Sequence, residues 1–294
     1  MVKSKIKKLI AKILNHFGLF VLPGHFYSPI PSKKEIRQHE EAIWPSQLPN
    51  TLPGLTLNTE PQIRLMQRFK PYYATLPFTA NKTEQLRYYF KNPNYPYSDA
   101  IILHCIMREF KPKRIIEIGC GFSSCVMMDT NEFFFNNTIE IKFIEPHPEL
   151  LFSLMKAKDK EGFRVLNKRI QNCELSEFSG LEENDILFID SSHVAKVNSD
   201  VNFIIFNILP SLNKGVLVHI HDIFYPFEYP LKWFYQGRAW NEAYFLRAFL
   251  QYNTSFEIIF FNTYLEHFSK EEFKKEMPLC LENRGASIWL KKIS

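Results

Sequence analysis

A short apolar run that leads directly into a glycine turn constrains the fold of this chain more than any other feature. Residues 114–118 contain three isoleucines and are typical of a strand that is covered on both faces. Gly119 and Gly121 follow, and glycine allows a tight turn with space for a ligand because it has no Cβ. Ser123 or Ser124 can then cap a helix whose free N–H groups face that ligand. The stretch therefore predicts a strand, a ligand-binding turn and a helix.

Two acidic residues narrow the kind of ligand. Glu117 lies inside the predicted strand, two residues before Gly119. A carboxylate there favours a cationic ligand over the pyrophosphate of a dinucleotide, which binds at a helix N-terminus. Glu145 ends the next apolar strand, predicted at 141–145, and an acid in that position accepts hydrogen bonds from ribose hydroxyls. The third glycine of the dinucleotide fingerprint is missing, because Ser124 stands in its place.

At these residues the chain resembles the class I S-adenosylmethionine (SAM)-dependent methyltransferases. Glu-Ile-Gly-Cys-Gly at 117–121 is similar to their first motif, and Phe-Ile-Glu-Pro at 143–146 is similar to their second. The resemblance covers about residues 95–292 and implies SAM as the cofactor. The turn, the two acids and the resemblance together predict a cofactor site made of Glu117, Gly119, Cys120, Gly121, Ser123, Ser124, Glu145, Pro146 and Asp190. The structural alternative is a glycine turn that packs a helix on a strand and binds no ligand.

Predicted strands and helices alternate along the rest of the chain. The strands are expected at 163–166, 185–190, 215–222, 256–262 and 286–292, and the helices at 148–157, 194–209 and 239–251. This alternation predicts a parallel sheet covered on both faces, in which ligands bind at the carboxyl ends of the strands. We expect an α/β fold with a doubly wound, Rossmann-like, seven-stranded sheet, and the resemblance implies that the last strand is antiparallel.

Two polar stretches follow the predicted fourth and fifth strands, at 190–193 and 219–222. We expect His193, His221 and Asp222 to act on the methyl acceptor, because a histidine with a pKa near neutrality can take a proton from a hydroxyl. Alternatively, Asp190, His221 and Asp222 hold Mg²⁺ or another divalent ion, which lowers the pKa of such a hydroxyl. Metal-assisted O-methyltransferases place acids after these same strands, although they usually show Asp-Asp or Asp-Asn where this chain has His-Asp. His219, inside the strand, is expected to be a core histidine.

An aromatic stretch follows the predicted fifth strand, with seven aromatic side chains within residues 224–235. Flat rings pack on the apolar face of a sugar or on another aromatic ring, so the stretch is either a substrate wall or a hydrophobic latch over the core. Residues 26–31, 188–193 and 219–226 resemble a bacterial methyltransferase-domain group often met beside glycan and secondary-metabolite genes. We predict O-methylation of a sugar or a small aromatic hydroxyl. The alternatives are an NAD-dependent oxidoreductase and a non-catalytic SAM-fold interaction protein.

The N-terminal part has a different character, and we expect three regions. Residues 1–22 hold a basic amphipathic helix, at 3–17, which is too short and too interrupted by lysine to span a bilayer. It either lies on an anionic membrane surface or packs on the domain or on a second subunit, and we favour packing. Residues 23–94 form a proline-rich extension, and residues 95–294 form the methyltransferase domain.

The distribution of charge argues against a nucleic-acid partner and leaves a small-molecule or glycan acceptor. The net charge is +5, and five lysines lie within the first twelve residues, so the remainder is formally neutral. A nucleic-acid-binding protein carries its basic residues across a whole face. The five cysteines form no Cys-X-X-Cys pair, which favours a protein of the reducing cytoplasm.

Overall fold

The computed structural model describes residues 10, 12–14, 16, 23–24 and 26–294. Most of the amphipathic helix predicted at 3–17 lies outside these residues, so its contact with a membrane or a second subunit stays a prediction. In the part of the chain that is described, no helix is long and apolar enough to cross a membrane. The chain divides into two compact units, one with residues 1–48 and 230–239 and the other with residues 49–229 and 240–294.

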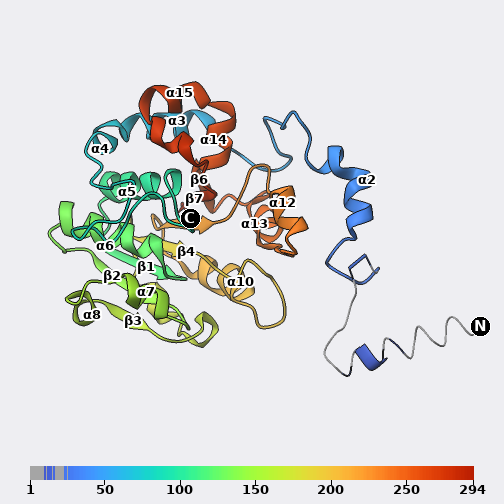
Figure 1. Cartoon of the computed structure of the whole chain (residues 1–294), viewed down its shortest axis with the longest axis horizontal. Coiled ribbons are helices and arrows are strands. Elements are labelled where there is room, and N and C mark those ends of the chain that lie inside the picture. Colours follow the sequence, from blue (N-terminus) through green and yellow to red (C-terminus); the bar gives the residue numbers. More distant parts are fainter. Residues whose placement is uncertain (1–9, 11, 15, 17–22, 25) are drawn as a thin grey trace, which may run out of the picture. The chain divides into compact units, whose positions relative to one another are not determined.

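The larger unit contains a seven-stranded sheet with the strand order β3-β2-β1-β4-β5-β7-β6. The strands are β1 Arg114–Ile118, β2 Glu140–Ile144, β3 Arg164–Leu166, β4 Ile186–Ile189, β5 Leu217–His221, β6 Phe256–Phe261 and β7 Ser287–Lys292. The first five strands pair in parallel, and β7 runs antiparallel between β5 and β6. The predicted doubly wound α/β fold with an antiparallel last strand is therefore confirmed (Figure 1).

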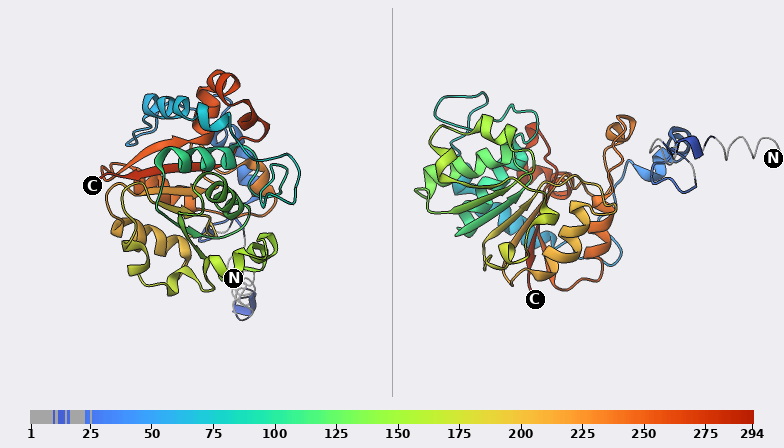
Figure 2. Two further views of the ribbon diagram at one scale, coloured as in Figure 1. Left: turned by 90° about the vertical axis from the view of Figure 1, so that its left-hand side faces the viewer. Right: turned by 90° about the horizontal axis from the view of Figure 1, so that it is seen from below.

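Helices cover both faces of this sheet. Figure 2 shows α5 and α6 (green) on one face and α10 and α13 (yellow to orange) on the other. The helices of the larger unit are α3 Thr59–Arg68, α4 Lys70–Tyr73, α5 Ser98–Phe110, α6 Phe122–Phe134, α7 Glu149–Leu154, α8 Asp159–Gly162, η1 Ile170–Asn172, α9 Ser176–Ser179, α10 Asp200–Phe203, η2 Ile204–Ile208, α11 Leu209–Ser211, α13 Glu242–Leu250, α14 Asn262–Phe268, α15 Lys270–Glu276 and η3 Pro278–Glu282. The strands between these layers are apolar and buried, as a sheet covered on both faces requires.

The helix predicted at 194–209 begins later and is irregular. It starts at Asp200, where the hydroxyl of Ser199 accepts a hydrogen bond from the N–H of Asn202 at 3.1 Å and caps the helix. It widens into a π-helical turn at 204–208 and continues through Pro210. Proline has no N–H to donate and its ring crowds the preceding turn, and a wider turn accommodates both effects. Residues 190–199 are therefore free to form a loop at the carboxyl end of β4.

The smaller unit consists of the described residues up to 48 together with residues 230–239. Its helices are α2 Lys33–Ile43, whose first turn is capped by the hydroxyl of Ser32, and α12 Leu231–Tyr235. The larger unit starts at residue 49, whereas we expected the domain boundary at residue 94. The functional division into an extension and a methyltransferase domain stays a prediction.

The aromatic stretch at 224–235 is divided between the two units. Tyr225 and Phe227 are buried in the larger unit, and both rings contact Phe261 at centroid distances of 5.8 Å and 5.4 Å. Tyr225 also lies 4.9 Å from the ring of Tyr264. These two rings act as a hydrophobic latch over the core, which was one of the two alternatives from the sequence.

Candidate active site

The carboxyl ends of β1, β2 and β4 meet at Gly119. The N–H of Gly119 donates to the carbonyl of Ile144 at 3.1 Å, and its φ of +80° lies in the region that favours glycine. A Cβ at this position would lie 1.9 Å from the carbonyl oxygen of Asp190, so no larger residue fits. Gly121 is under no such constraint, because its φ is −177° and a Cβ there would meet only Leu150, at 3.5 Å. The turn therefore needs its first glycine to bring the β1 and β4 ends together.

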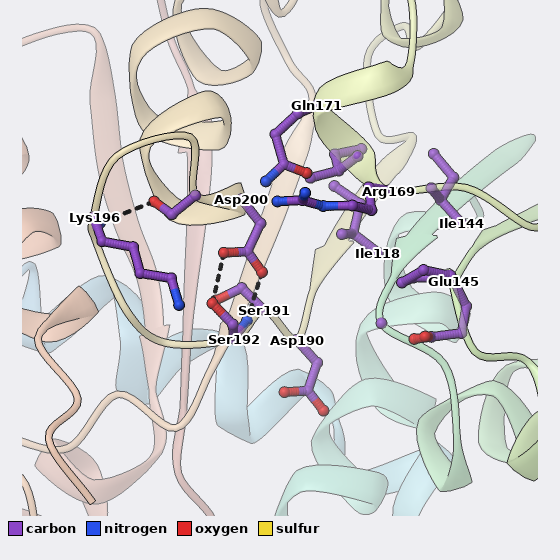
Figure 3. Close-up of a pocket in the computed structure, with 14 residues that line it drawn as sticks. Ile118, Ile144, Glu145, Arg169, Gln171, Asp190, Ser191, Ser192, Lys196 and Asp200 are labelled. Atoms are coloured by element: carbon purple, nitrogen blue, oxygen red, sulfur yellow. Dashed lines mark hydrogen bonds between the residues drawn. The ribbon is translucent and has the colours of Figure 1, made fainter. Parts of the chain in front are cut away.

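A pocket of about 340 Å³ opens at this meeting point (Figure 3). Its lining comes from four successive strand ends, namely Ile118 and Gly119 after β1, Ile144, Glu145 and Pro146 after β2, Arg169, Ile170 and Gln171 after β3, and Asp190, Ser191, Ser192, Lys196, Ser199 and Asp200 after β4. Its volume falls in the range of small-ligand sites, and its position is the one at which open parallel sheets bind ligands.

Glu145 is held in place by backbone donors and keeps lone pairs for a ligand. Its Oε1 accepts the N–H of His147 at 2.8 Å, and its Oε2 accepts the N–H of Cys120 at 3.3 Å. A carboxylate offers about four acceptor positions, so unused ones remain for the hydroxyls of a ribose. Arg169 and Gln171, which follow β3, both donate to the carbonyl of Asn198, at 3.1 Å and 2.7 Å. The predicted role of Glu145 thus fits the geometry of the pocket.

Glu117 lies behind the pocket and holds the turn against helix α6. Its carboxylate is fully buried and accepts the hydroxyls of Ser123, at 2.5 Å, and Ser124, at 2.6 Å. The hydroxyl of Ser124 in turn accepts the N–H of Gly121 at 3.0 Å. Burial raises the pKa of Glu117 to about 8. A pKa of about 8 makes the side chain of Glu117 mostly neutral at pH 7. The cofactor contacts predicted for Glu117, Cys120, Gly121, Ser123 and Ser124 stay predictions.

Next to the pocket, His193 lies among three carboxylates. Its Nε2 is 3.3 Å from Oδ1 of Asp190 and 3.6 Å from Oδ2 of Asp222, and its Nδ1 is 2.8 Å from Oε2 of Glu242. The ring of Trp240 covers the imidazole, with the two centroids 4.2 Å apart. The structure thus brings together the side chains that the sequence placed after the fourth and fifth strands.

Glu242 and its neighbour Asn241 bind the loop that follows β4. Glu242 accepts the hydroxyl of Ser191 at 2.8 Å, and the amide of Asn241 bonds Ala195 through both its oxygen and its nitrogen. The N–H groups of Asn241 and Glu242 both donate to the carbonyl of His193. Sequence reasoning missed Glu242, since no local pattern indicates that the first turn of α13 reaches a loop so distant in the chain.

Two sequence comparisons decide the family. The profile of a family described as a methyltransferase domain matches residues 116–223, from β1 to the loop after β5. An uncharacterized protein of Archaeoglobus fulgidus is 35% identical over 191 residues, which are 62% of this chain and 85% of that protein. The chain belongs to the class I SAM-dependent methyltransferase family. This assignment replaces the nicotinamide-dependent and the non-catalytic alternatives.

Two solved structures of methyltransferases are similar to this chain at low sequence identity. The O-methyltransferase TomG of Streptomyces achromogenes, in complex with SAM, has a TM-score of 0.46 and 14% identity, and the match covers 79% of this chain and 99% of that one. The methyltransferase PaMTH1 of Podospora anserina, bound to SAH, has a TM-score of 0.44 and 14% identity, with 91% and 99% covered.

The protonation states of His193 and the carboxylates around it depend on burial and on their contacts with one another. Burial alone would lower the pKa of His193, but the contacts with Asp190 and Glu242 raise it to about 10. Burial would likewise raise the pKa of Asp190, yet the hydrogen bond from His193 holds it below its ordinary value. At neutral pH, His193 is therefore an imidazolium. A ring that already carries a proton cannot accept another, so the geometry favours a carboxylate as the proton acceptor.

The other two histidines of this methyltransferase lie deeper. His221 is buried, its Nε2 is 3.7 Å from Oδ1 of Asp222, and its Nδ1 has no hydrogen-bond partner among the described residues. Burial would lower the pKa of His221, but the charge of Asp222 raises it above its ordinary value. His219 stacks on Phe188 at 3.8 Å, and burial holds its pKa well below the ordinary value. His219 is thus the neutral core histidine that the sequence predicted.

The predicted metal site is not supported. Among the described residues, no group of three or more His, Cys, Asp and Glu side chains is arranged to hold a metal ion. Both oxygens of Asp222 face ring nitrogens, Oδ2 that of His193 and Oδ1 that of His221. Mg²⁺ prefers six oxygen ligands near 2.1 Å. Here the imidazole of His193 lies between the carboxylates of Asp190 and Asp222. These residues do not fit a divalent ion.

Proposed function

We propose that this methyltransferase transfers a methyl group to a hydroxyl of a sugar or of a small aromatic acceptor. The observation that carries the proposal is the convergence of Asp190 and Asp222 beside the pocket, with His193 fixed against both. When bound, SAM supplies an electrophilic methyl group on a cationic sulfur. A hydroxyl becomes a better nucleophile when a nearby group accepts its proton, and a carboxylate can be that group.

The pocket residues suit the adenosine part of SAM. Glu145 is positioned for the ribose hydroxyls, and Ile144 and Ile170 supply apolar surface on the same side as Gln171. Asp190 lines the same pocket, and its side chain is 38% exposed. A carboxylate at that point stabilises a cationic ligand, because opposite charges attract.

Asp222 is the group we assign as proton acceptor. Its side chain is 15% exposed, and burial raises its pKa although His221 and His193 oppose the shift. A raised pKa makes a carboxylate a stronger base, which suits it to accept a proton from a hydroxyl. The ring of His193, whose Nε2 lies 3.6 Å from Oδ2 of Asp222, attracts the same carboxylate by its charge.

Trp240 supports a flat or ring-shaped acceptor. Its indole packs on His193 and lies 5.9 Å from the ring of Tyr229, so it is held beside the reacting carboxylates. An indole face binds the apolar face of a sugar or an aromatic ring at little entropic cost, since its own position is already fixed.

Cofactor binding is tested first, by calorimetric titration of the protein with SAM and, separately, with NAD. We expect SAM to bind and NAD not to bind. Glu145→Ala removes charge-assisted hydrogen bonds to the ribose, and we expect it to weaken SAM binding by about 2–4 kcal/mol. The exposed Glu149→Ala, at the start of α7, is the matched control and should leave the affinity unchanged.

The acceptor is tested with radiolabelled SAM and separate pools of phenols, monosaccharides and amines. We expect label in ethers of the hydroxyl pools. Asp222→Asn should lower kcat by about 10²–10⁴ and leave the SAM dissociation constant unchanged. Transfer to the amine pool alone, by a protein that binds SAM normally, would overturn the proposal.

A further inference from the structure

The position of His193 affects whether a divalent cation can bind between Asp190 and Asp222. Metal-assisted methyl transfer to a hydroxyl uses a divalent ion, which lowers the pKa of that hydroxyl. Here the two carboxylates that follow β4 and β5, Asp190 and Asp222, face a ring nitrogen of this chain instead. An ion bound to both carboxylates near 2.1 Å would need the space in which that nitrogen lies.

We propose that the imidazole of His193 occupies the place between Asp190 and Asp222 in which a divalent cation would otherwise bind, and that it keeps such cations out of the acceptor site. The catalytic use of this arrangement rests on the proposed hydroxyl methylation, whereas the exclusion of cations does not.

The ring is held in that place by Glu242 and Trp240. Glu242 fixes Nδ1 at 2.8 Å, and the hydroxyl of Ser191 holds the other oxygen of Glu242 at the same distance. The indole of Trp240 covers one face of the ring, and the side chain of His193 is only 6% exposed. Leaving the site would therefore cost His193 a charge-assisted hydrogen bond and a ring contact at once.

The three carboxylates make the site attractive to a cation as soon as the ring is gone. Asp190, Asp222 and Glu242 all lie within 3.6 Å of one ring nitrogen or the other. Buried carboxylates without a cationic partner are costly, so the site without an imidazole gains free energy by taking up a metal ion. Carboxylate oxygens are the ligands that Mg²⁺ and Mn²⁺ prefer.

The proposal can be tested by replacing His193, because the backbone at this position accommodates glycine without strain. The φ of His193 is +59°, a conformation in which glycine is unstrained and asparagine is tolerated. His193→Gly thus removes the ring and relaxes the backbone, and His193→Asn is a second variant with a neutral side chain. His147, exposed on the loop after β2, is the matched position, so His147→Gly controls for the loss of a histidine.

The experiment is calorimetric titration of the full-length protein and these variants with Mn²⁺ alone. We expect no binding by the wild type or His147→Gly at millimolar Mn²⁺, and at least tenfold tighter binding by His193→Gly. Adding Asp222→Asn to His193→Gly should abolish the gain. Manganese binding by the wild type would overturn the proposal, and so would equal binding, or none, by the wild type and both His193 variants. No acceptor is used, so a failed methylation assay leaves this result standing.

Discussion

Oε2 of Glu242 lies 2.8 Å from Nδ1 of His193, although 49 residues separate the two in the chain. The contact joins the first turn of α13 to the loop after β4, and it places a third carboxylate around one imidazole. Glu242 does not itself line the pocket, so a change in Glu242 acts first on the charge of His193.

Glu242→Gln should lower the pKa of His193. The groups that face this ring are Asp190 after β4, Asp222 after β5 and Glu242 of α13, and the ring of His221 lies near by. Removing one close opposite charge shifts a pKa by about 1–3 units. We expect a fall of this size from the wild-type value of about 10 in histidine NMR titrations. Ser191→Ala removes the hydrogen bond to Glu242 and the one from the N–H of His193 but takes no charge away, so it should shift the pKa much less.

The same contact predicts how stability depends on pH. A histidine whose pKa is raised in the folded state, here from 6.5 to about 10, contributes stability that is complete below pH 6.5 and is lost as the pH rises through 10. We expect the free energy of unfolding of the wild type to fall between these values, and Glu242→Gln to flatten the fall. Equal slopes for the two proteins in urea titrations would contradict the assigned contact.

Gly119→Ala should be far more harmful than Gly121→Ala. The first adds a Cβ 1.9 Å from the backbone oxygen of Asp190 at a φ of +80°, and neither partner can move aside. Strain of this kind costs at least about 2 kcal/mol. At Gly121 the backbone is extended, and the loss should stay below about 1 kcal/mol. Urea unfolding of both variants gives the comparison, and similar losses would contradict the close approach of β1 and β4.

The raised pKa of Glu117 predicts a second dependence of stability on pH. Its pKa is raised in the folded state from 4.5 to about 8, so its contribution to stability is complete below pH 4.5 and is lost as the pH rises through 8. Glu117→Gln resembles the neutral acid and can keep both serine contacts, so it should remove this slope with little loss of stability at pH 5. A variant that keeps the wild-type slope in thermal unfolding between pH 5 and 8 would place the titration elsewhere.

The parts of the site that follow from local sequence were predictable. Gly119, Glu145, Asp190 and Asp222 each follow an apolar run, and parallel strands bring such residues to one edge whatever lies between them. The loop at 190–199 was not predictable, because its residues read as the start of a helix. Its conformation depends on bonds from distant partners, among them Asn241, that no local pattern reveals. The charge of His193 was missed for the same reason, since it depends on Glu242.

Arg87 is the centre of a buried network of ion pairs outside the candidate active site. Arg87 is 2% exposed at its side chain and pairs with Asp129 at 2.7 Å, Asp159 at 2.5 Å and Glu132 at 2.7 Å. It fastens the segment before α5 to helices α6 and α8. Arg87→Met leaves two carboxylates buried without their cation, which costs about 3–5 kcal/mol.

Arg68 supplies the matched control. It pairs with Glu109 at 2.7 Å, but its side chain is 54% exposed, and exposed pairs contribute less than about 1 kcal/mol. We therefore expect urea unfolding to show a large loss of stability for Arg87→Met and almost none for Arg68→Met. Comparable losses would mean that burial does not set the strength of these pairs. A loss for Arg87→Met that disappears near pH 3 would identify the stranded carboxylates as its cause, since protonation removes their uncompensated charge.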